Sequence, residues 1–361
     1  MLRLLADDLT GALDTSAEFT GLFGAITVVW PDTSIPNLKD SLSIDSGTRE
    51  LDRGRAFARA TKLASMLNGA GIAFKKIDSL LRGPWVAELD ACLRTGYWDS
   101  CIVAPAFSYQ GRCTRHGQQY ALSTNGCWQA VGADIIAQLR EQKIEARLGT
   151  IDAPLSPGVI VFDAESDEDL VRIAEIGRSY GGRVLWCGSG GLASALAAGT
   201  EVATSRKLLS PVLGIFGSDH AATAAQLSRC AGASVPASGN RIDLEAVKRR
   251  LARGLAFVKL NAPEGSSRDQ AARYFEEEVA RLGRAIEPPR TLIISGGETL
   301  KAQCLTTGAH TLKVTGRLEP GVPRSVIEDG AWRGVEVISK SGAFGPPDLF
   351  RKLLSENALN Y

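Results

Sequence analysis

The chain has 361 residues, enough for two domains, with 44% hydrophobic and 22% charged residues and a net charge of +1. This composition is typical of a soluble globular protein, and the small net charge argues against a nucleic-acid or membrane partner. The first residues are too short an apolar run, and too soon acidic, for a signal peptide. Seven cysteines without a Cys-x-x-Cys pair and three scattered histidines indicate reduced thiols and no metal centre. We therefore predict a cytoplasmic protein.

The first strand is predicted at residues 2–5, and Asp7 and Asp8 follow it directly, before a helical pattern over 12–22. Carboxylates at the carboxyl end of a strand lie where open α/β sheets bind ligands. A helix cap explains one of these acids, but two adjacent like charges need a cation or a donor-rich ligand. Both are therefore candidate site residues.

Further strands are predicted at 25–30 and 42–44, and the second of these ends in the sequence Asp45-Ser46-Gly47-Thr48-Arg49. This segment offers hydroxyls and a guanidinium to a polar ligand. We slightly favour the alternative, the capped start of the helix that is predicted over 52–69.

A second polar cluster follows the strand predicted from residue 72, where Lys76, Asp78 and Arg82 lie close together. Arg82 is able to hold a carboxylate through two parallel hydrogen bonds, and Asp78 is able to accept a proton or hold a cation. Strand 101–104 leads into a long polar loop that contains Arg112, and a helix is predicted over 131–143.

Residues 188–193 match the Gly-x-Gly-x-x-Ala form of the dinucleotide-binding turn. That pattern expects an acid at the end of the next strand, which here, at 212–216, ends in Gly217-Ser218 instead. We therefore interpret residues 188–193 as a tight packing turn. Residues 201–210 predict a connector between two domains.

The most informative stretch is the strand predicted at 291–294, which turns through Gly296 and Gly297 into a helix. Such a turn aims backbone N–H groups and the positive end of a helix dipole at a ligand, so it favours an anion. An ordinary βα turn is the equally weighted alternative. Lys340 follows a strand predicted at 335–338, and we consider it for phosphate neutralisation, with a solvated surface lysine as the alternative.

Taken together, five segments resemble, in order, the four-carbon acid sugar kinase family. They are Ala-Asp-Asp-Leu-Thr-Gly-Ala at 6–12, Lys-Ile-Asp-Ser-x-Leu-Arg-Gly at 76–83, Pro-Ala-Phe at 105–107 with Gly-Arg at 111–112, Gly-Gly-Glu-Thr at 296–299, and Lys-Ser-Gly-x-Phe-Gly at 340–345. Leu80 and Pro84 depart from the family pattern beside the expected substrate pocket, which leaves the identity of the acid open.

The resemblance implies an α/β protein of two Rossmann-like three-layer domains with a cleft between them. The N-terminal domain, over 1–205, would bind the sugar acid, and the C-terminal domain, over 206–361, the nucleotide. It implies ATP-dependent phosphorylation of a hydroxyl on threonate, erythronate or 3-oxo-tetronate. ATP would contact Ser218, Gly296, Gly297, Glu298, Thr299 and Gly342.

Phosphoryl transfer needs positioning and charge neutralisation more than covalent help, and Mg²⁺ would bridge the ATP phosphates. In this hypothesis Arg82, or else Arg112, clamps the substrate carboxylate, and Lys76 helps to bind the substrate. Asp8 or Asp78 orients or deprotonates the attacking hydroxyl, and the sequence does not choose between them. Asp7 holds the loop or a metal-bound water, and Lys340 assists transfer.

Two other functional classes stay open. One is a nicotinamide-dependent oxidoreductase acting on a sugar acid, which rests on residues 188–193. The other is a non-catalytic sugar-acid-binding protein. The expected partner is the small-molecule substrate, with a homodimer left open.

Overall fold

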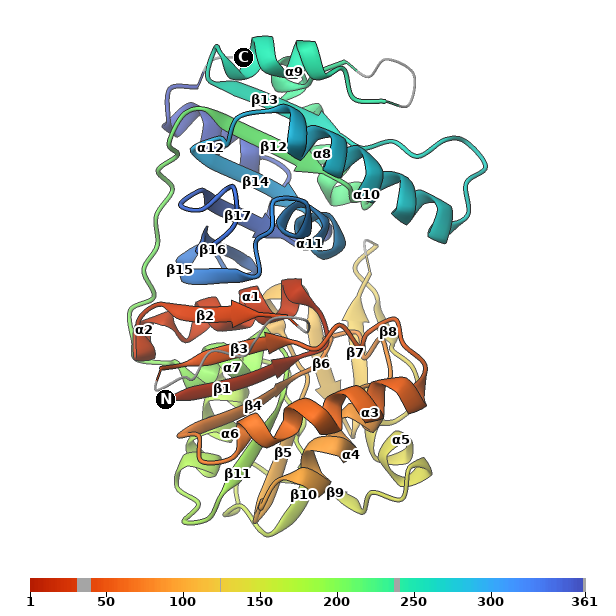
Figure 1. Ribbon diagram of the computed structural model, residues 1–361. Coiled ribbons are helices and arrows are strands. Elements are labelled where there is room, and N and C mark those ends of the chain that lie inside the picture. The colour runs from red at the N-terminus through yellow and green to blue at the C-terminus, as the bar shows by residue number, and fades with distance from the viewer. Residues whose placement is uncertain (31–39, 124, 237–240, 360–361) are drawn as a thin grey trace. The chain divides into compact units, whose positions relative to one another are not determined.

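The computed structural model describes residues 1–30, 40–123, 125–236 and 241–359. The chain divides into two compact units, Met1–Val202 and Ala203–Tyr361. Figure 1 shows their elements. Both units are mixed α/β structures, as expected.

The first unit is built on a sheet whose described strands all pair in parallel, so their carboxyl ends lie along one edge. Their order is β2 (Ile26–Val29), β3 (Leu42–Asp45), β1 (Leu2–Ala6), β4 (Ile72–Lys76), β11 (Val184–Gly188), β5 (Ser100–Ala104), β10 (Gly158–Val161) and β9 (Ala146–Leu148). Neighbours in this order include the strands that precede Asp7 and Asp78, which places the two polar segments side by side.

Helices cover both faces of this sheet. On one face, Val103 and Leu185 pack in a core with Trp85 of α4. On the other, Gly177 of α6 lies so close to Trp186 that an added Cβ would be 2.2 Å from its ring. The first face carries α3 (Arg53–Ala64), η1 (Ser65–Leu67), α4 (Trp85–Thr95) and α5 (Ile135–Glu141), and the second α1 (Leu9–Glu18), α2 (Thr20–Phe23), α6 (Asp167–Arg178) and α7 (Gly190–Leu196).

The segment after β5 is not the loop that the sequence analysis predicts. After the short helix η2 (Ser108–Gln110), it forms an antiparallel sheet of β6 (Arg112–Arg115), β7 (Gln118–Leu122) and β8 (Trp128–Ala130). Its first turn has positive φ at His116 and Gly117, which a strand pattern in sequence does not reveal. The helix predicted over 131–143 is accordingly shorter and begins at Ile135, after the capping residue Asp134.

The second unit has a mixed sheet. Four parallel strands, β13 (Leu255–Lys259), β12 (Val212–Phe216), β14 (Thr291–Ser295) and β17 (Glu336–Lys340), are extended by the antiparallel strands β16 (Val322–Ile327) and β15 (Thr311–Glu319). The β15–β16 hairpin turns at Gly321, whose φ is 76°. Our sequence analysis does not anticipate this hairpin.

An aromatic core holds one face of the second sheet. Phe216 and Phe257 from the strands pack on Phe350 of α12, with Phe216 ring-centroid distances of 5.0 and 5.1 Å. The helices of this unit are α8 (Ala221–Ser228), η3 (Ala231–Ala233), α9 (Leu244–Leu251), α10 (Arg268–Ala285), α11 (Gly297–Thr306) and α12 (Leu349–Glu356).

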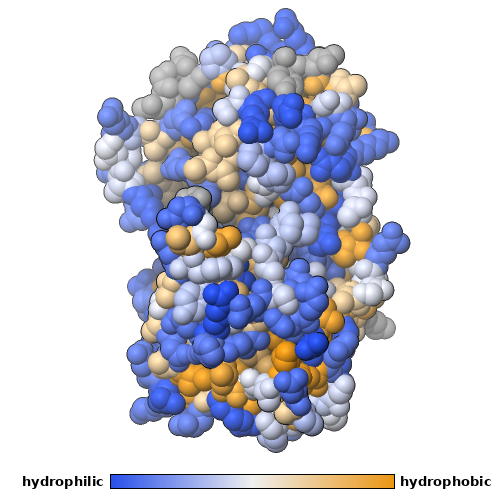
Figure 2. Space-filling view, turned by 180° about the vertical axis from the view of Figure 1, so that it is seen from behind, coloured by the Kyte–Doolittle hydropathy of each residue, from blue (hydrophilic) through white to orange (hydrophobic). Residues whose placement is uncertain are grey.

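The surface view in Figure 2 shows mainly hydrophilic side chains, with hydrophobic residues gathered in smaller patches. Within the described ranges, we find no helix that is both long enough and apolar enough to cross a bilayer.

Candidate functional site

An acidic cluster lies at the carboxyl edge of the first sheet, and Arg49 is at its centre. The Arg49 guanidinium donates to both Asp7 carboxylate oxygens, at 2.7 and 2.8 Å, and to Asp8 at 2.5 Å. Its Nη2 also lies 3.8 Å from Asp78 Oδ1. One arginine therefore joins the ends of β1, β3 and β4.

The two adjacent aspartates differ in environment. Asp7 is buried; burial by itself would raise its pKa, but the bidentate Arg49 contact outweighs this effect and lowers it. Asp8 keeps 17% side-chain exposure and caps α1 by accepting from Gly11 N at 2.8 Å. Burial, against the opposing effect of Arg49 and with a contribution from Asp7, raises the pKa of Asp8 to about 6. Asp8 thus titrates close to neutral pH.

Asp78 is held by its own loop. Arg82 donates from Nε and Nη2 to the two Asp78 oxygens, each at 2.7 Å, and the amides of Leu80 and Arg82 donate to Oδ2 at 3.2 and 3.3 Å. Burial would raise the pKa of Asp78, but these bonds and nearby Arg49 bring it well below its usual range. Asp78 is therefore a carboxylate that resists protonation.

Arg112 lies at the start of β6 beside this pair. Its Nε is buried without a hydrogen-bond partner, and Nη1 has only a 3.4 Å contact with Gln110 Oε1. Burial lowers the pKa of Arg112, partly countered by nearby Asp78. Lys76 is also buried, and its Nζ would lie 2.9 Å from a Cβ added at Gly11. The site thus contains guanidinium and ammonium groups that suit an anionic ligand.

The sequence analysis underestimated Arg49. It favoured the start of a helix for residues 45–49, but α3 begins at Arg53 and is capped by Asp52. The sequence feature that could have identified Arg49 as a site residue was an arginine a few residues beyond the end of a strand. The pairing of β3 with β1, which brings Arg49 to Asp7 and Asp8, is a long-range contact.

A second cluster lies where β12, β14 and β17 end, at neighbouring positions in the second sheet. The predicted strand, glycine turn and helix are confirmed: β14 leads through Gly296, with φ of 109°, into α11. A Cβ on Gly342 would lie 1.9 Å from Ser218 Oγ, and one on Gly217 2.2 Å from Thr299 Oγ1. The structure thus brings Ser218, Thr299 and Gly342 together, on glycine-containing turns that are partly buried and have little side-chain bulk.

Lys340 lies beneath these turns. It is 1% exposed, so the alternative of a surface lysine is wrong. Nζ donates to Thr223 Oγ1 at 3.0 Å, Ser295 Oγ at 3.3 Å and Gly342 O at 3.2 Å. Among the described residues, no carboxylate lies within ion-pair distance, and burial lowers the pKa of Lys340 to about 7.

The Gly-x-Gly-x-x-Ala turn serves packing, as the sequence analysis expects. A Cβ on Gly188 or on Gly191 would lie 2.5 Å from a backbone carbonyl, that of Ala104 or of Ala106. Ser189 Oγ donates to Ala106 O at 2.7 Å. These glycines let α7 approach the segment that follows β5.

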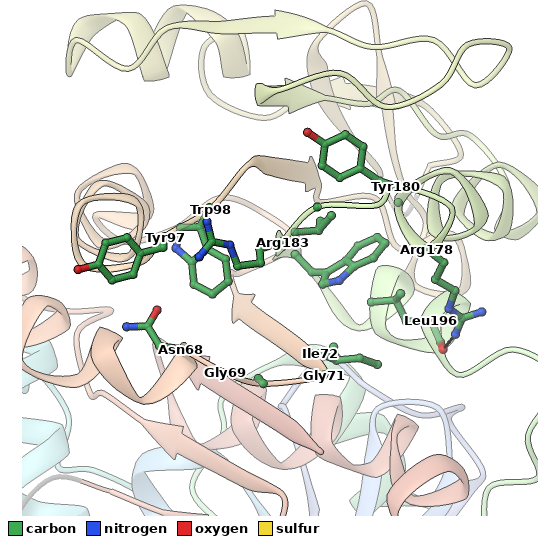
Figure 3. A pocket seen from close by; sticks show the side chains of 15 residues that line it. Asn68, Gly69, Gly71, Ile72, Tyr97, Trp98, Arg178, Tyr180, Arg183 and Leu196 are labelled. Carbon is green, nitrogen blue, oxygen red and sulfur yellow. Dashed lines mark hydrogen bonds between the residues drawn. The ribbon is translucent and has the colours of Figure 1, made fainter.

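A cavity of about 390 Å³ lies at the other edge of the first sheet, where β4 and β11 begin. Figure 3 shows Tyr97, Trp98 and Arg183 on one side of it and Arg178 on another. Arg183 pairs with Asp99, and Arg178 donates to Leu196 O. The arginines that line this cavity are engaged within the chain, and the cavity is remote from the acidic cluster. We therefore do not consider it the functional site.

Comparison with known families gives the two units their context. A model described as a sugar-binding N-terminal domain matches residues 2–132 and 123–196, and one described as a nucleotide-binding C-terminal domain matches residues 250–350. The chain belongs to the four-carbon acid sugar kinase family. The resemblance found in five sequence segments is thereby confirmed.

Relatives in this family match along almost the whole chain. A D-threonate kinase of Bordetella bronchiseptica is 28% identical, over 96% of this chain and 95% of the relative. A 3-oxo-tetronate kinase of Cupriavidus necator is 26% identical, over 99% and 97%. The fold is similar to that of a Haemophilus influenzae protein, with a TM-score of 0.72, 19% identity and coverage of 99% and 100%. This last likeness concerns the fold alone.

Proposed function

We propose that this four-carbon acid sugar kinase family member uses ATP to phosphorylate a hydroxyl of a threonate, an erythronate or a 3-oxo-tetronate. The observation that carries the proposal is the match over nearly the full length to relatives named for these three activities. The acid would bind to the first unit and the nucleotide to the second, in the Rossmann-like, three-layer domains expected over 1–205 and 206–361.

In this proposal the second unit holds ATP by its backbone. Ser218, the turn at 296–299 and Gly342 would contact the phosphates, because close approach needs glycine and the start of α11 favours an anion. Lys340 would act from beneath, as a buried positive charge with no acidic partner among the described residues. Its charge would be stabilised when a phosphate arrives.

We assign the substrate carboxylate to Arg112 rather than to Arg82. Arg82 already directs Nε and Nη2 at Asp78, so a substrate clamp there would have to break or share that pair. Arg112 has a buried Nε without a partner. A buried unpaired donor is costly, and a carboxylate ligand would relieve that cost. Lys76 would contribute a second positive charge.

We assign the proton acceptor to Asp8 rather than to Asp78. An effective general base has a pKa near the working pH, and Asp8 is partly exposed with a pKa of about 6. Asp78 is held by two hydrogen bonds from Arg82, and its lowered pKa makes it too weak a base to accept the proton. Asp78 would instead orient the loop, and Asp7 would hold Arg49 in place.

Magnesium fits this chain as an ion that arrives with the triphosphate. Among the described residues, no three His, Cys, Asp or Glu side chains gather to hold a metal, and Asp7 and Asp78 are paired with arginines. When bound, the ion would neutralise charge on the phosphates.

An ADP-release assay tests the proposal. We expect ADP from ATP only when a threonate, erythronate or 3-oxo-tetronate is present, and none with the matching sugar alcohols. Acid binding without ADP release would favour the non-catalytic binding protein. NAD binding without ATP binding would favour the oxidoreductase, although the packed glycines at 188–193 argue against that alternative.

A further inference from the structure

Gln119, on β7, is a fully buried carboxamide that the sequence analysis did not single out. Its Oε1 accepts from Thr114 Oγ1 at 2.7 Å, and its Nε2 donates to Ser79 O at 2.9 Å and to Pro105 O at 3.3 Å. Both amide hydrogens and the oxygen are therefore used. Among side chains of this length, only a carboxamide supplies two donors and an acceptor together.

These bonds join three separate segments of the first unit. Ser79 directly follows Asp78 in the loop after β4, Pro105 follows β5, and Thr114 belongs to β6, the strand that begins with Arg112. Gln119 therefore fixes the position of the strand that bears Arg112 relative to the loop that bears Asp78 and Arg82.

The loop after β4 needs such support. Leu81 has φ of +53°, a left-handed conformation that costs energy for a non-glycine residue. The backbone bonds from Leu80 and Arg82 to Asp78 lie within the loop and do not tie it to the rest of the site. The Gln119 bond to Ser79 O does so, over a separation of 40 residues.

We infer that Gln119 is a positioning residue of the acid site, which sets the distance between Arg112 and the Asp78–Arg82 pair so that the site fits a short carboxylated polyol. This inference rests on the proposed kinase function. It concerns the first unit, so changes at Gln119 should act on the acid and spare the nucleotide.

The test uses the full chain with Gln119→Met, which keeps the length and removes all three hydrogen bonds. Gln129→Met is the control for the substitution itself, because Gln129 lies on β8 of the same small antiparallel sheet but is exposed. We expect Gln119→Met to raise the KM for the acid by about tenfold or more and to leave the KM for ATP within about twofold. The control should change neither.

An unchanged acid KM in folded Gln119→Met would overturn the inference, as would equal increases in the two KM values. If Gln119→Met does not fold, Thr114→Val removes only the bond that orients the carboxamide and should give a smaller shift in the same direction.

Acid affinity measured by calorimetry separates this inference from the proposed function. A wild-type chain that binds acid without releasing ADP refutes the kinase, yet Gln119→Met should still weaken binding. If Gln119→Met and the wild type bind the acid with equal affinity, the inference is overturned.

Discussion

Asp78 accepts two hydrogen bonds of 2.7 Å from the guanidinium of Arg82, four residues further along the chain. This pair supports two of our proposed assignments. Because Arg82 is engaged with Asp78, we propose Arg112 for the substrate carboxylate. Because Asp78 is engaged with Arg82, we propose Asp8 as the base.

The first prediction separates the two aspartates. Asp8→Asn should lower kcat by at least about a hundredfold, because the attacking hydroxyl loses its proton acceptor. Asp78→Asn should mainly raise the KM for the acid and keep substantial kcat, because it loosens a loop. Steady-state kinetics on both variants measures the difference, and full loss of turnover in Asp78→Asn with activity in Asp8→Asn would reverse the assignment.

The pH profile of the wild type supplies the control for Asp8. The pKa of Asp8 in the ligand-free chain is raised to about 6, and a base must be ionised, so kcat/KM should fall as pH decreases through about 6. A rate that stays level from pH 7 to pH 5 would argue against Asp8.

A second prediction concerns the substrate carboxylate. Arg112→Met should raise the acid KM by roughly two orders of magnitude, because it removes a charge-assisted contact. Arg82→Met should have a smaller effect on this KM, through the freed Asp78. The matching sugar alcohol provides the control: Arg112→Met should not weaken its inhibition. If only Arg82→Met weakens acid binding, the clamp is Arg82.

These assignments show what a sequence can supply. The strand and glycine turn at 291–297, the acids after β1 and the packing turn at 188–193 depend on local pattern and were predicted. The contacts of Arg49 depend on the pairing of β3 with β1. Those of Gln119 depend on an antiparallel hairpin, which the polar sequence of that segment does not predict. Such contacts join distant residues, so hydrophobic periodicity carries little information about them.

The burial of Lys340 illustrates the same limit. A lysine side chain is usually exposed to solvent, and the sequence around Lys340 gave no reason to expect burial. Its Nζ is surrounded by three separate segments of the second unit: Thr223 of α8, Ser295 of β14 and Phe350 of α12, whose ring centroid is 6.0 Å away.

A third prediction addresses the nucleotide turns. Gly342→Ala would place a Cβ 1.9 Å from Ser218 Oγ and 3.0 Å from Ser218 Cβ, so the Ser218 hydroxyl must rotate away and the two turns must shift slightly. The KM for ATP should rise by about tenfold or more while acid affinity stays the same. Gly181→Ala, where an added Cβ meets no atom within 4 Å, is the matched control. Normal ATP kinetics in Gly342→Ala would exclude this turn from nucleotide binding.

The fourth prediction links Lys340 to stability. Burial lowers its pKa to about 7, from an ordinary value of 10.5, so the unfolded chain binds the proton more tightly than the folded one. The buried Lys340 side chain therefore lowers the free energy of unfolding by its full amount below pH 7. This effect shrinks as the pH rises and vanishes above pH 10.5. Each pKa unit corresponds to about 1.4 kcal/mol, so the total is on the order of a few kcal/mol.

Lys340→Met should thus raise the melting temperature relative to wild type at pH 6, with a smaller gain at pH 9. Its neighbours keep partners, because Thr223 Oγ1 still donates to Gly342 O at 2.8 Å. Lys259→Met, at the exposed end of β13, should show no such pH dependence. Thermal unfolding of the three chains between pH 6 and pH 9 measures this. If the difference in melting temperature between Lys340→Met and wild type is independent of pH, Lys340 stays protonated throughout this range. The buried charge would then need an acidic partner.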